Sequence, residues 1–240
     1  MVECVLPNIN VRGLIEVDSL DREITISTPI GHKTISTLPV NKGTNDAMRT
    51  YRLTYFDVRG RAELARLVFA AAGESFEDRR VAREEWAELK KETPFGQIPV
   101  LEVDGKPLAQ SYAIARFLAR EFGLAGRSNW ESAQIDQVMD LAEDLRRELL
   151  KGIFEKEPDK KKDLEQKLQD EVFPRFIGFF QKLLNNNGGQ YFVGPSLSLA
   201  DLAVLDIFDT PLQMYPSLLD KSPALQAHRK LLESSPKLDD

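Results

Sequence analysis

Residues 92–111 read ETPFGQIPVLEVDGKPLAQS, and the rest of the chain can be placed around this stretch. Two short apolar runs flank the dipeptide Asp104-Gly105, which accepts positive φ and therefore favours a tight hairpin. Pro99 has no backbone N–H, so it belongs at the mouth of a strand or at a special bond such as a cis peptide. The stretch predicts two strands joined by a hairpin, with a proline at the entry of the first.

A helix is predicted directly after this hairpin. Residues 111–123 read SYAIARFLAREFG and carry apolar residues at helical spacing. Gln110 and Ser111 would then lie at a helix N-terminus, where unpaired backbone N–H groups favour an anion. The sequence therefore predicts an anion pocket beside a strand that begins with proline.

Length and composition indicate a soluble globular protein. The chain has 240 residues, of which 42% are hydrophobic and 29% charged, and this length suits one large or two small domains. The formal net charge of −6 argues against nucleic acid or an anionic membrane as partner. No apolar run approaches the roughly 20 residues of a spanning helix, and no secretory signal is evident. The single cysteine, Cys4, excludes an intrachain disulfide and a Cys-x-x-Cys redox pair, so we expect a cytoplasmic protein.

The order of the predicted elements divides the chain into three parts. Residues 1–48 form an extension in which β-branched and polar residues alternate, and we expect a hairpin at 23–40, with His32 in a solvated turn, followed by a linker. Residues 49–127 predict the order β-α-β-α-β-β-α of a thioredoxin-like α/β domain. Residues 128–240 show helical periodicity and no strand pattern, which predicts an all-α C-terminal domain.

Two features of the helical part carry further predictions. Pro174 lies inside a helical pattern at 163–184 and should kink or interrupt that helix. Ser198 and Asp201 have the spacing of a capping box ahead of an apolar run, with Ser198 as N-cap. Both are therefore expected to be structural rather than catalytic.

Several motifs occur in an order that resembles the N-terminal domain of the glutathione S-transferases. They are YRLTYFDVRGRAELARLVFAAAGESFEDRRV, then a W-x-x-x-K pattern, then TPFGQIPVLEVDG, then LAQSYAIARFLAREFGLAG. The resemblance covers residues 50–235 and is closest to the sigma class, which includes prostaglandin D synthases of the haematopoietic type. The chain stops at Asp240, where members of this family normally continue, so we expect the helical domain to be short at its C-terminus.

The chemistry of a thiol explains why such a site needs a hydrogen-bond donor. A thiol with a pKa near about 8.5 is only slightly ionised at neutral pH, and a hydroxyl that donates to the sulfur stabilises the thiolate. A hydrogen bond to a charged group contributes roughly 1.5–3 kcal/mol, or about one to two pKa units. The resemblance gives this role to Tyr55 and places Arg61 close to its hydroxyl. From the strand pattern alone, Tyr55 is more simply a strand aromatic.

The resemblance also implies which residues bind glutathione. They are Trp86, Lys90, Gly96, Gln97, Ile98, Pro99, Gln110, Ser111 and Asp144. Trp86 and Lys90 share one helix face and would hold the glycine carboxylate, although a packing tryptophan and a solvated lysine would give the same pattern. The segment up to Pro99 would offer backbone groups to the cysteinyl part. Gln110 and Ser111 would bind the γ-glutamyl carboxylate with the help of the helix dipole.

A partner subunit is implied as well. Family members usually complete the γ-glutamyl amine site with an acid from the second subunit of a homodimer. Asp144 in VMDLAEDLRR matches that acid best, and Asp140 and Glu143 are its neighbours. No metal is chemically required.

The implied function is a glutathione transferase that conjugates glutathione to hydrophobic electrophiles, with peroxidase or prostaglandin isomerase activity as further activities to consider. The alternative is a structural protein with reduced or no activity, like the S-crystallins of the lens. A thiol oxidoreductase on the same fold is excluded, because no cysteine lies near Tyr55 or Arg59. The second substrate cannot be named, because helical-domain side chains that vary freely form its pocket.

Overall fold

The computed structural model of the chain describes residues 14–17, 23–28, 31–36 and 49–235. Internal contacts separate the chain into two units, Met1–Met48 and Arg49–Asp240.

The first unit contains a three-stranded antiparallel sheet in the order β1-β2-β3. Its strands are β1 (Leu14–Val17), β2 (Glu23–Thr28) and β3 (Gly31–Ser36). The predicted hairpin is confirmed by the pairing of β2 with β3, whereas β1 was not predicted. The prediction that His32 lies in the turn is wrong, because the pairing reaches Thr28 and Gly31 and so places His32 in the ladder opposite Ser27. The predicted linker at 41–46 lies outside the described residues.

The second unit begins with a four-stranded sheet in the order β5-β4-β6-β7. Its strands are β4 (Tyr51–Phe56), β5 (Glu77–Val81), β6 (Val100–Val103) and β7 (Lys106–Ala109). β4 runs parallel to β5 and antiparallel to β6, and β6 and β7 form the predicted hairpin. Asp104 and Gly105 have φ values of 50° and 76°, as a two-residue turn of this kind requires. The predicted cis bond is also confirmed, between Ile98 and Pro99.

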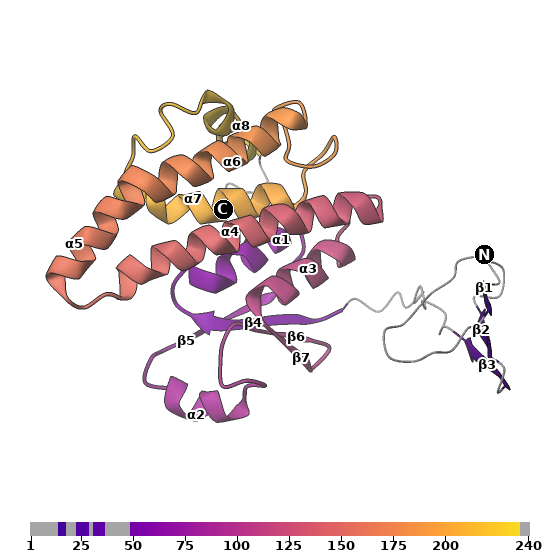
Figure 1. Cartoon of the computed structure of the whole chain (residues 1–240). Coiled ribbons are helices and arrows are strands. Elements are labelled where there is room, and N and C mark those ends of the chain that lie inside the picture. Colours follow the sequence, from indigo (N-terminus) through magenta and orange to yellow (C-terminus); the bar gives the residue numbers. More distant parts are fainter. Residues whose placement is uncertain (1–13, 18–22, 29–30, 37–48, 236–240) are drawn as a thin grey trace. The chain divides into compact units, whose positions relative to one another are not determined.

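Three helices and a short 3₁₀ turn accompany this sheet. They are η1 (Gly60–Ala62), α1 (Glu63–Ala72), α2 (Trp86–Glu92) and α3 (Ser111–Glu121). α1 and α3 cover one face of the sheet, and α2 lies on the opposite side (Figure 1). α1 ends at Gly73, whose φ of 73° is a left-handed conformation that glycine adopts readily. This is the predicted thioredoxin-like arrangement.

The remaining helices form an all-α part. They are α4 (Asn129–Phe154), α5 (Pro158–Lys167), a π-helical turn η2 (Leu168–Val172), α6 (Phe173–Asn186), α7 (Leu199–Met214) and α8 (Pro223–Glu233). The predicted interruption at Pro174 is confirmed, because the π-helical turn comes directly before α6, which has Pro174 in its first turn. A proline ring clashes with the carbonyl of the residue four positions earlier, so the helix cannot pass through unchanged.

The sheet part and the helical part share one hydrophobic core. Leu53 of β4, Phe69 of α1, Met139 of α4 and Phe208 of α7 are fully or almost fully buried in the same cluster. Full burial of such a side chain stabilises the fold by roughly 1.5–3 kcal/mol. α1 and α3 therefore lie between the sheet and the pair α4 and α7 (Figure 1). Glu143 of α4 contacts Arg61 in the turn that follows β4.

The start of α7 is held by a buried polar cluster. Asp201 is 0% exposed and accepts hydrogen bonds from the backbone N–H groups of Phe192 and Ser198, both at 2.8 Å. The Ser198 hydroxyl at 2.8 Å and the His228 ring at 2.9 Å are its other partners. The predicted capping box is therefore confirmed, and every lone-pair direction of this carboxylate is used.

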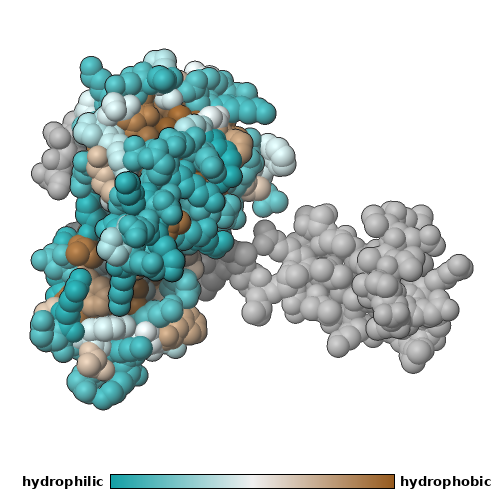
Figure 2. Space-filling view, turned by 60° about the vertical axis from the view of Figure 1, so that its left-hand side comes forward, coloured by the Kyte–Doolittle hydropathy of each residue, from teal (hydrophilic) through white to brown (hydrophobic). Residues whose placement is uncertain are grey.

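Most of the surface seen in Figure 2 is hydrophilic, and hydrophobic residues reach it in small separate patches. Phe95, Trp130 and Phe154 are among the large apolar side chains that are exposed. Within the described ranges, no helix has the length and hydropathy that crossing a membrane requires.

Candidate active site

A cavity of about 440 Å³ opens where the end of β4, the start of α2, the segment before β6 and the start of α3 meet α4. Its lining residues are Phe56, Arg61, Trp86, Phe95, Gly96, Gln97, Ile98, Pro99, Ala109, Gln110, Ser111 and Glu143. Most of the residues predicted from the sequence are therefore brought together in one place. The volume is in the range of small-molecule sites.

Tyr55 lies beside this cavity, at the end of β4, with its hydroxyl held by the next turn. The hydroxyl oxygen accepts a hydrogen bond from the backbone N–H of Arg61 at 3.2 Å. Because that bond uses a lone pair, the phenolic proton remains available for donation. Gly60 makes this approach possible: its φ is +47°, and a Cβ there would lie 2.8 Å from the Tyr55 hydroxyl.

The Arg61 side chain points to the helical part. Its Nη2 and Nη1 atoms bind the two carboxylate oxygens of Glu143 at 3.0 and 3.2 Å. Glu143 is only 15% exposed and lines the cavity from α4. Sequence reasoning treated Glu143 only as a neighbour of Asp144; its spacing of four residues from buried Met139 was the signal that it faces inward.

The α2 side of the cavity carries Trp86 and an unpaired cation. The Trp86 ring lines the cavity and packs edge-on against Phe56, with 5.6 Å between centroids. Lys90 is not part of the lining, but its side chain runs along Gly96, where a Cβ would lie 3.3 Å from Lys90 Cε. No ion pair forms at Lys90 among the described residues, whereas neighbouring Lys91 pairs with Glu88 at 2.7 Å. The Lys90 ammonium is therefore available to a ligand carboxylate.

The segment before β6 offers free backbone groups. Gln97 and Ile98 lie outside the strands and make no backbone–backbone hydrogen bond with any residue that the structure describes. Both line the cavity, just ahead of the cis bond to Pro99. An extended ligand can pair with such an edge in the manner of an added strand.

The start of α3 forms the opposite end. Gln110 is the N-cap residue, has a φ of 75° and makes no side-chain capping bond. A residue other than glycine held at such a φ carries strain of about 1 kcal/mol or more, and such residues cluster at ligand sites. Because Gln110 and Ser111 line the cavity, the uncapped N–H groups of the first turn favour an anion here.

Comparison with known proteins agrees with this geometry. Family models described as the N-terminal and C-terminal domains of glutathione S-transferase match residues 51–120 and 143–240. A "probable glutathione S-transferase 8" of Caenorhabditis elegans is 42% identical over 188 residues, which cover 77% of this chain and 91% of the relative. The chain belongs to the glutathione S-transferase family.

Two further comparisons show the range of this family. S-crystallin 2 of Enteroctopus dofleini is 34% identical over 203 residues, covering 80% of this chain and 94% of the crystallin. A solved structure of monomeric Na-GST-3, a glutathione S-transferase of the hookworm Necator americanus, is 39% identical with a TM-score of 0.73. That match covers 79% of this chain and 94% of the hookworm chain. Relatives named as glutathione S-transferases identify this member as an enzyme of the family, whose co-substrate is glutathione.

Tyr55 and Lys90 contact residues that line the glutathione S-transferase cavity, whereas the predicted site residue Asp144 lies away from the cavity of its own chain. It is 61% exposed on α4, 3.6 Å from Arg147, and lines a separate groove of about 650 Å³. Asp140 lines the same groove, so neither acid faces Tyr55. Its predicted role depends on a partner subunit and stays a prediction.

A buried charge cluster lies behind the cavity of this glutathione S-transferase. Arg146 binds Asp206 of α7 at 2.5 Å, and its Nε lies 3.9 Å from Glu143 without a hydrogen-bond partner. Burial raises the pKa of Asp206 from its ordinary value near 3.8 to about 6, although Arg146 opposes the shift. Burial also raises the pKa of Tyr112, the neighbour of Ser111, to about 12. No group of three or more His, Cys, Asp or Glu residues in the described part of the chain could hold a metal ion.

Proposed function

We propose that this enzyme stabilises the thiolate of glutathione with the Tyr55 hydroxyl and transfers the sulfur to a hydrophobic electrophile. The observation that carries this proposal is the hydrogen bond from the Arg61 N–H to the Tyr55 oxygen at 3.2 Å. It fixes the oxygen at the edge of the cavity and leaves the proton free to face the sulfur. A single charge-assisted hydrogen bond of roughly 1.5–3 kcal/mol is enough to make the thiolate predominant.

The cavity supports an orientation for the tripeptide. The glycine carboxylate would lie near Lys90 and Trp86, the cysteinyl backbone along Gln97 and Ile98, and the γ-glutamyl carboxylate at the start of α3. The two anionic ends of glutathione would then meet the unpaired cation and the uncapped helix N-terminus. This assignment also places the sulfur between them, on the Tyr55 side.

The proposed reaction is a nucleophilic displacement or addition. The thiol proton leaves to solvent, and the sulfur lone pair forms a bond to an electrophilic carbon. In a displacement, the leaving group departs with its bonding electrons; in an addition, the product takes up a proton. Peroxidase or prostaglandin isomerase activity would use the same thiolate, and a panel of electrophiles, lipid peroxides and prostaglandin H2 distinguishes among these activities.

We further propose a sigma-like homodimer in the cytoplasm, with the domain boundary at residues 127 and 128. Ser128 caps α4 by accepting a hydrogen bond from the Glu131 N–H at 3.1 Å, which supports a helix start at that boundary. Asp144 would contribute to the γ-glutamyl amine site of the partner subunit. Mass in solution by light scattering, combined with the glutathione affinity of Asp144→Asn, tests this. A monomer with normal affinity, as the monomeric hookworm relative permits, would remove the shared site.

The second candidate is a structural protein with little activity, supported by the similarity to an S-crystallin. The unpaired Lys90 and the free backbone groups of Gln97 and Ile98 favour the enzyme, because a structural protein that does not bind glutathione would not need them. The deciding experiment follows the ultraviolet absorbance of the thiolate against pH with glutathione bound. We expect the apparent pKa of the bound thiol to rise by about one to two units in Tyr55→Phe. An unchanged titration would remove the role of Tyr55.

A further inference from the structure

Arg146 is a buried cation close to the glutathione cavity, and one of its donors is unsatisfied. Its side chain is 14% exposed on α4; Nη2 binds Asp206 of α7 at 2.5 Å, and Tyr112 of α3 faces the same guanidinium. Its Nε has no hydrogen-bond partner among the described residues and lies 3.9 Å from Oε2 of Glu143. Leaving a buried N–H without an acceptor is unfavourable, so the position of this group calls for a reason.

Glu143 connects Arg146 to the cavity. Its oxygens accept hydrogen bonds from Nη2 and Nη1 of Arg61 at 3.0 and 3.2 Å. Oε2, the oxygen that accepts the longer of these bonds, is also the one nearest the Nε of Arg146. A shift of less than about 1 Å would bring Oε2 within hydrogen-bond distance of that Nε. One carboxylate therefore lies between two arginines and can divide its charge between them.

This division of charge matters because Arg61 and Glu143 both line the cavity. Whatever positive charge Glu143 leaves on Arg61 acts on an anion bound there, and a nearby positive charge favours the ionised form of a thiol. The more strongly Arg146 attracts Glu143, the larger the charge that remains on Arg61.

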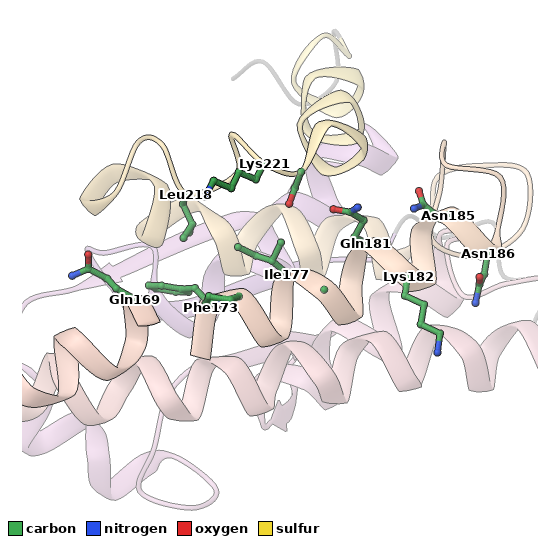
Figure 3. Close-up of a pocket in the computed structure, with 12 residues that line it drawn as sticks. Gln169, Phe173, Ile177, Gln181, Lys182, Asn185, Asn186, Leu218 and Lys221 are labelled. Carbon is green, nitrogen blue, oxygen red and sulfur yellow. The ribbon is translucent and has the colours of Figure 1, made fainter. Parts of the chain in front are cut away.

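The larger groove of the helical part gives the pair of Arg146 and Asp206 no other role. This groove has a volume of about 680 Å³ and lies between α6 and the chain that leads into α8 (Figure 3). Neither Arg146 nor Asp206 is among the residues that line it. In the described part of the chain, the ion pairs of Arg146 lead to Asp206 and to Glu143, and of these two only Glu143 lines the glutathione cavity.

We propose that Arg146 is a positioning residue of the transferase reaction. It attracts the Glu143 carboxylate from inside the protein and so leaves part of the Arg61 charge to stabilise the thiolate of glutathione. Asp206 anchors the guanidinium of Arg146 through Nη2, which keeps Nε near Glu143. This inference rests on the proposed function, because it concerns the thiolate of that reaction.

The test is a double-mutant cycle on the full-length protein, measured as the apparent pKa of the glutathione thiol bound to the enzyme. It compares the wild type, Glu143→Gln, the paired substitution Arg146→Met with Asp206→Asn, and the combination of all three. The ultraviolet absorbance of the thiolate against pH gives each value. Because Arg146 and Asp206 are replaced together, neither of them is left as a buried charge without its partner.

Replacing the pair should raise the thiol pKa by about 0.5–1 unit, because Glu143 then neutralises Arg61 more completely. Glu143→Gln should lower the thiol pKa, because Arg61 keeps its full charge. In the Glu143→Gln background, replacing the pair should move the thiol pKa by less than about 0.2 unit, because no carboxylate is left to divide. The KM for glutathione should stay within about twofold when the pair is replaced, since neither side chain lines the cavity.

Arg147→Gln is the matched control. Arg147 is the next residue of α4, and its Nε lies 3.6 Å from Glu143, closer than that of Arg146. Its side chain is 66% exposed, so solvent screens its charge and the thiol pKa should not change in this variant.

A shift of the same size in both backgrounds would show that the pair acts only through the fold and would overturn the proposal. No shift in either background, or an equal shift in Arg147→Gln, would overturn it as well. So would a raised KM at an unchanged thiol pKa, which would place the effect at the start of α3, beside Tyr112. A thiol pKa that does not depend on Tyr55 removes the proposed function and this inference together, whereas one that depends on Tyr55 but not on Arg146 removes the inference alone.

Discussion

Helices α3 and α7 begin in opposite ways, although both start against the same core. At α7, the buried carboxylate of Asp201 satisfies four donors, two of them from Ser198 and one each from Phe192 and His228. At α3, Gln110 supplies no cap, has a φ of 75° and lines a cavity. Donors that are satisfied inside the chain contribute to stability, whereas donors left open toward a cavity are available to a ligand. The difference separates a structural helix start from a binding one.

The largest effect is expected at the satisfied helix start. Asp201→Ala leaves four donors, including those of Phe192 and His228, without their acceptor in a dry interior, so we expect a loss of about 3–5 kcal/mol in the free energy of unfolding. Urea denaturation measures it. Ser128→Ala, which removes a solvent-exposed cap, is the control and should cost only about 1 kcal/mol. If Asp201→Ala lost no more unfolding free energy than Ser128→Ala, the contrast between the two helix starts would be contradicted.

The second largest effect is expected at Tyr55, the proposed hydrogen-bond donor to the thiolate. Tyr55→Phe should lower turnover by one to two orders of magnitude, roughly 1.4–2.8 kcal/mol, with little change in glutathione affinity or unfolding. The reason is that sulfur needs this donor only once it is ionised. Steady-state kinetics across pH 6–8 checks the prediction. A turnover of Tyr55→Phe equal to that of the wild type throughout that range would contradict it.

A third prediction concerns Asp206, a second buried aspartate on α7. Asp206 has Arg146 as its main partner, and Glu63 and Arg59 are the other groups that act on its charge. Burial raises the pKa of Tyr112, and Asp206 adds to that shift. Because the folded-state pKa of Asp206 is raised above the unfolded value, protonation stabilises the fold, and this contribution is lost as pH rises from about 4 to about 6.

The excess stability of the wild type over Asp206→Asn should therefore fall across that window, by on the order of 2 kcal/mol, and stay level above it. Chemical denaturation of both proteins at a series of pH values measures the difference. A difference that rises with pH, as a lowered pKa would give, would show that Arg146 outweighs burial. The amide variant is the control for all other titrating groups.

The smallest effect is expected at the two groups proposed to bind the carboxylates of glutathione, one at the open start of α3 and one on α2. Ser111→Ala or Lys90→Ala should raise the Michaelis constant for glutathione about 3- to 10-fold, with a smaller change in turnover, because both residues act in ground-state binding. Lys91→Ala, on the same helix but paired with Glu88, provides the control and should behave as wild type. Turnover lost at unchanged affinity would assign Ser111 and Lys90 to the chemical step instead.

Local chemistry explains which features could be predicted from the sequence. The hairpin at Asp104-Gly105, the cis bond at Pro99, the capping box at Ser198 and the interruption at Pro174 each depend on a few adjacent residues. Most of the cavity lining could also be predicted, because three of its segments carry family motifs.

The features that were missed depend on packing between distant elements. The pairing of Arg61 with Glu143, and of Arg146 with Asp206, exists only because α4 packs against α7 and lies within reach of the turn η1. Helical periodicity shows that Glu143 is near the buried face, but not which cation it meets. Asp144, one residue further on, consequently faces a different groove.

Gln110 has a consequence for engineering this chain. Its backbone conformation, with a φ of 75°, costs about 1 kcal/mol or more, and glycine would adopt the same φ with less strain. A screen for heat resistance alone would therefore favour replacing it early. The same replacement removes the side-chain amide that borders the glutathione cavity. A library selected on melting temperature alone would therefore become enriched in more stable proteins with a lower affinity for glutathione.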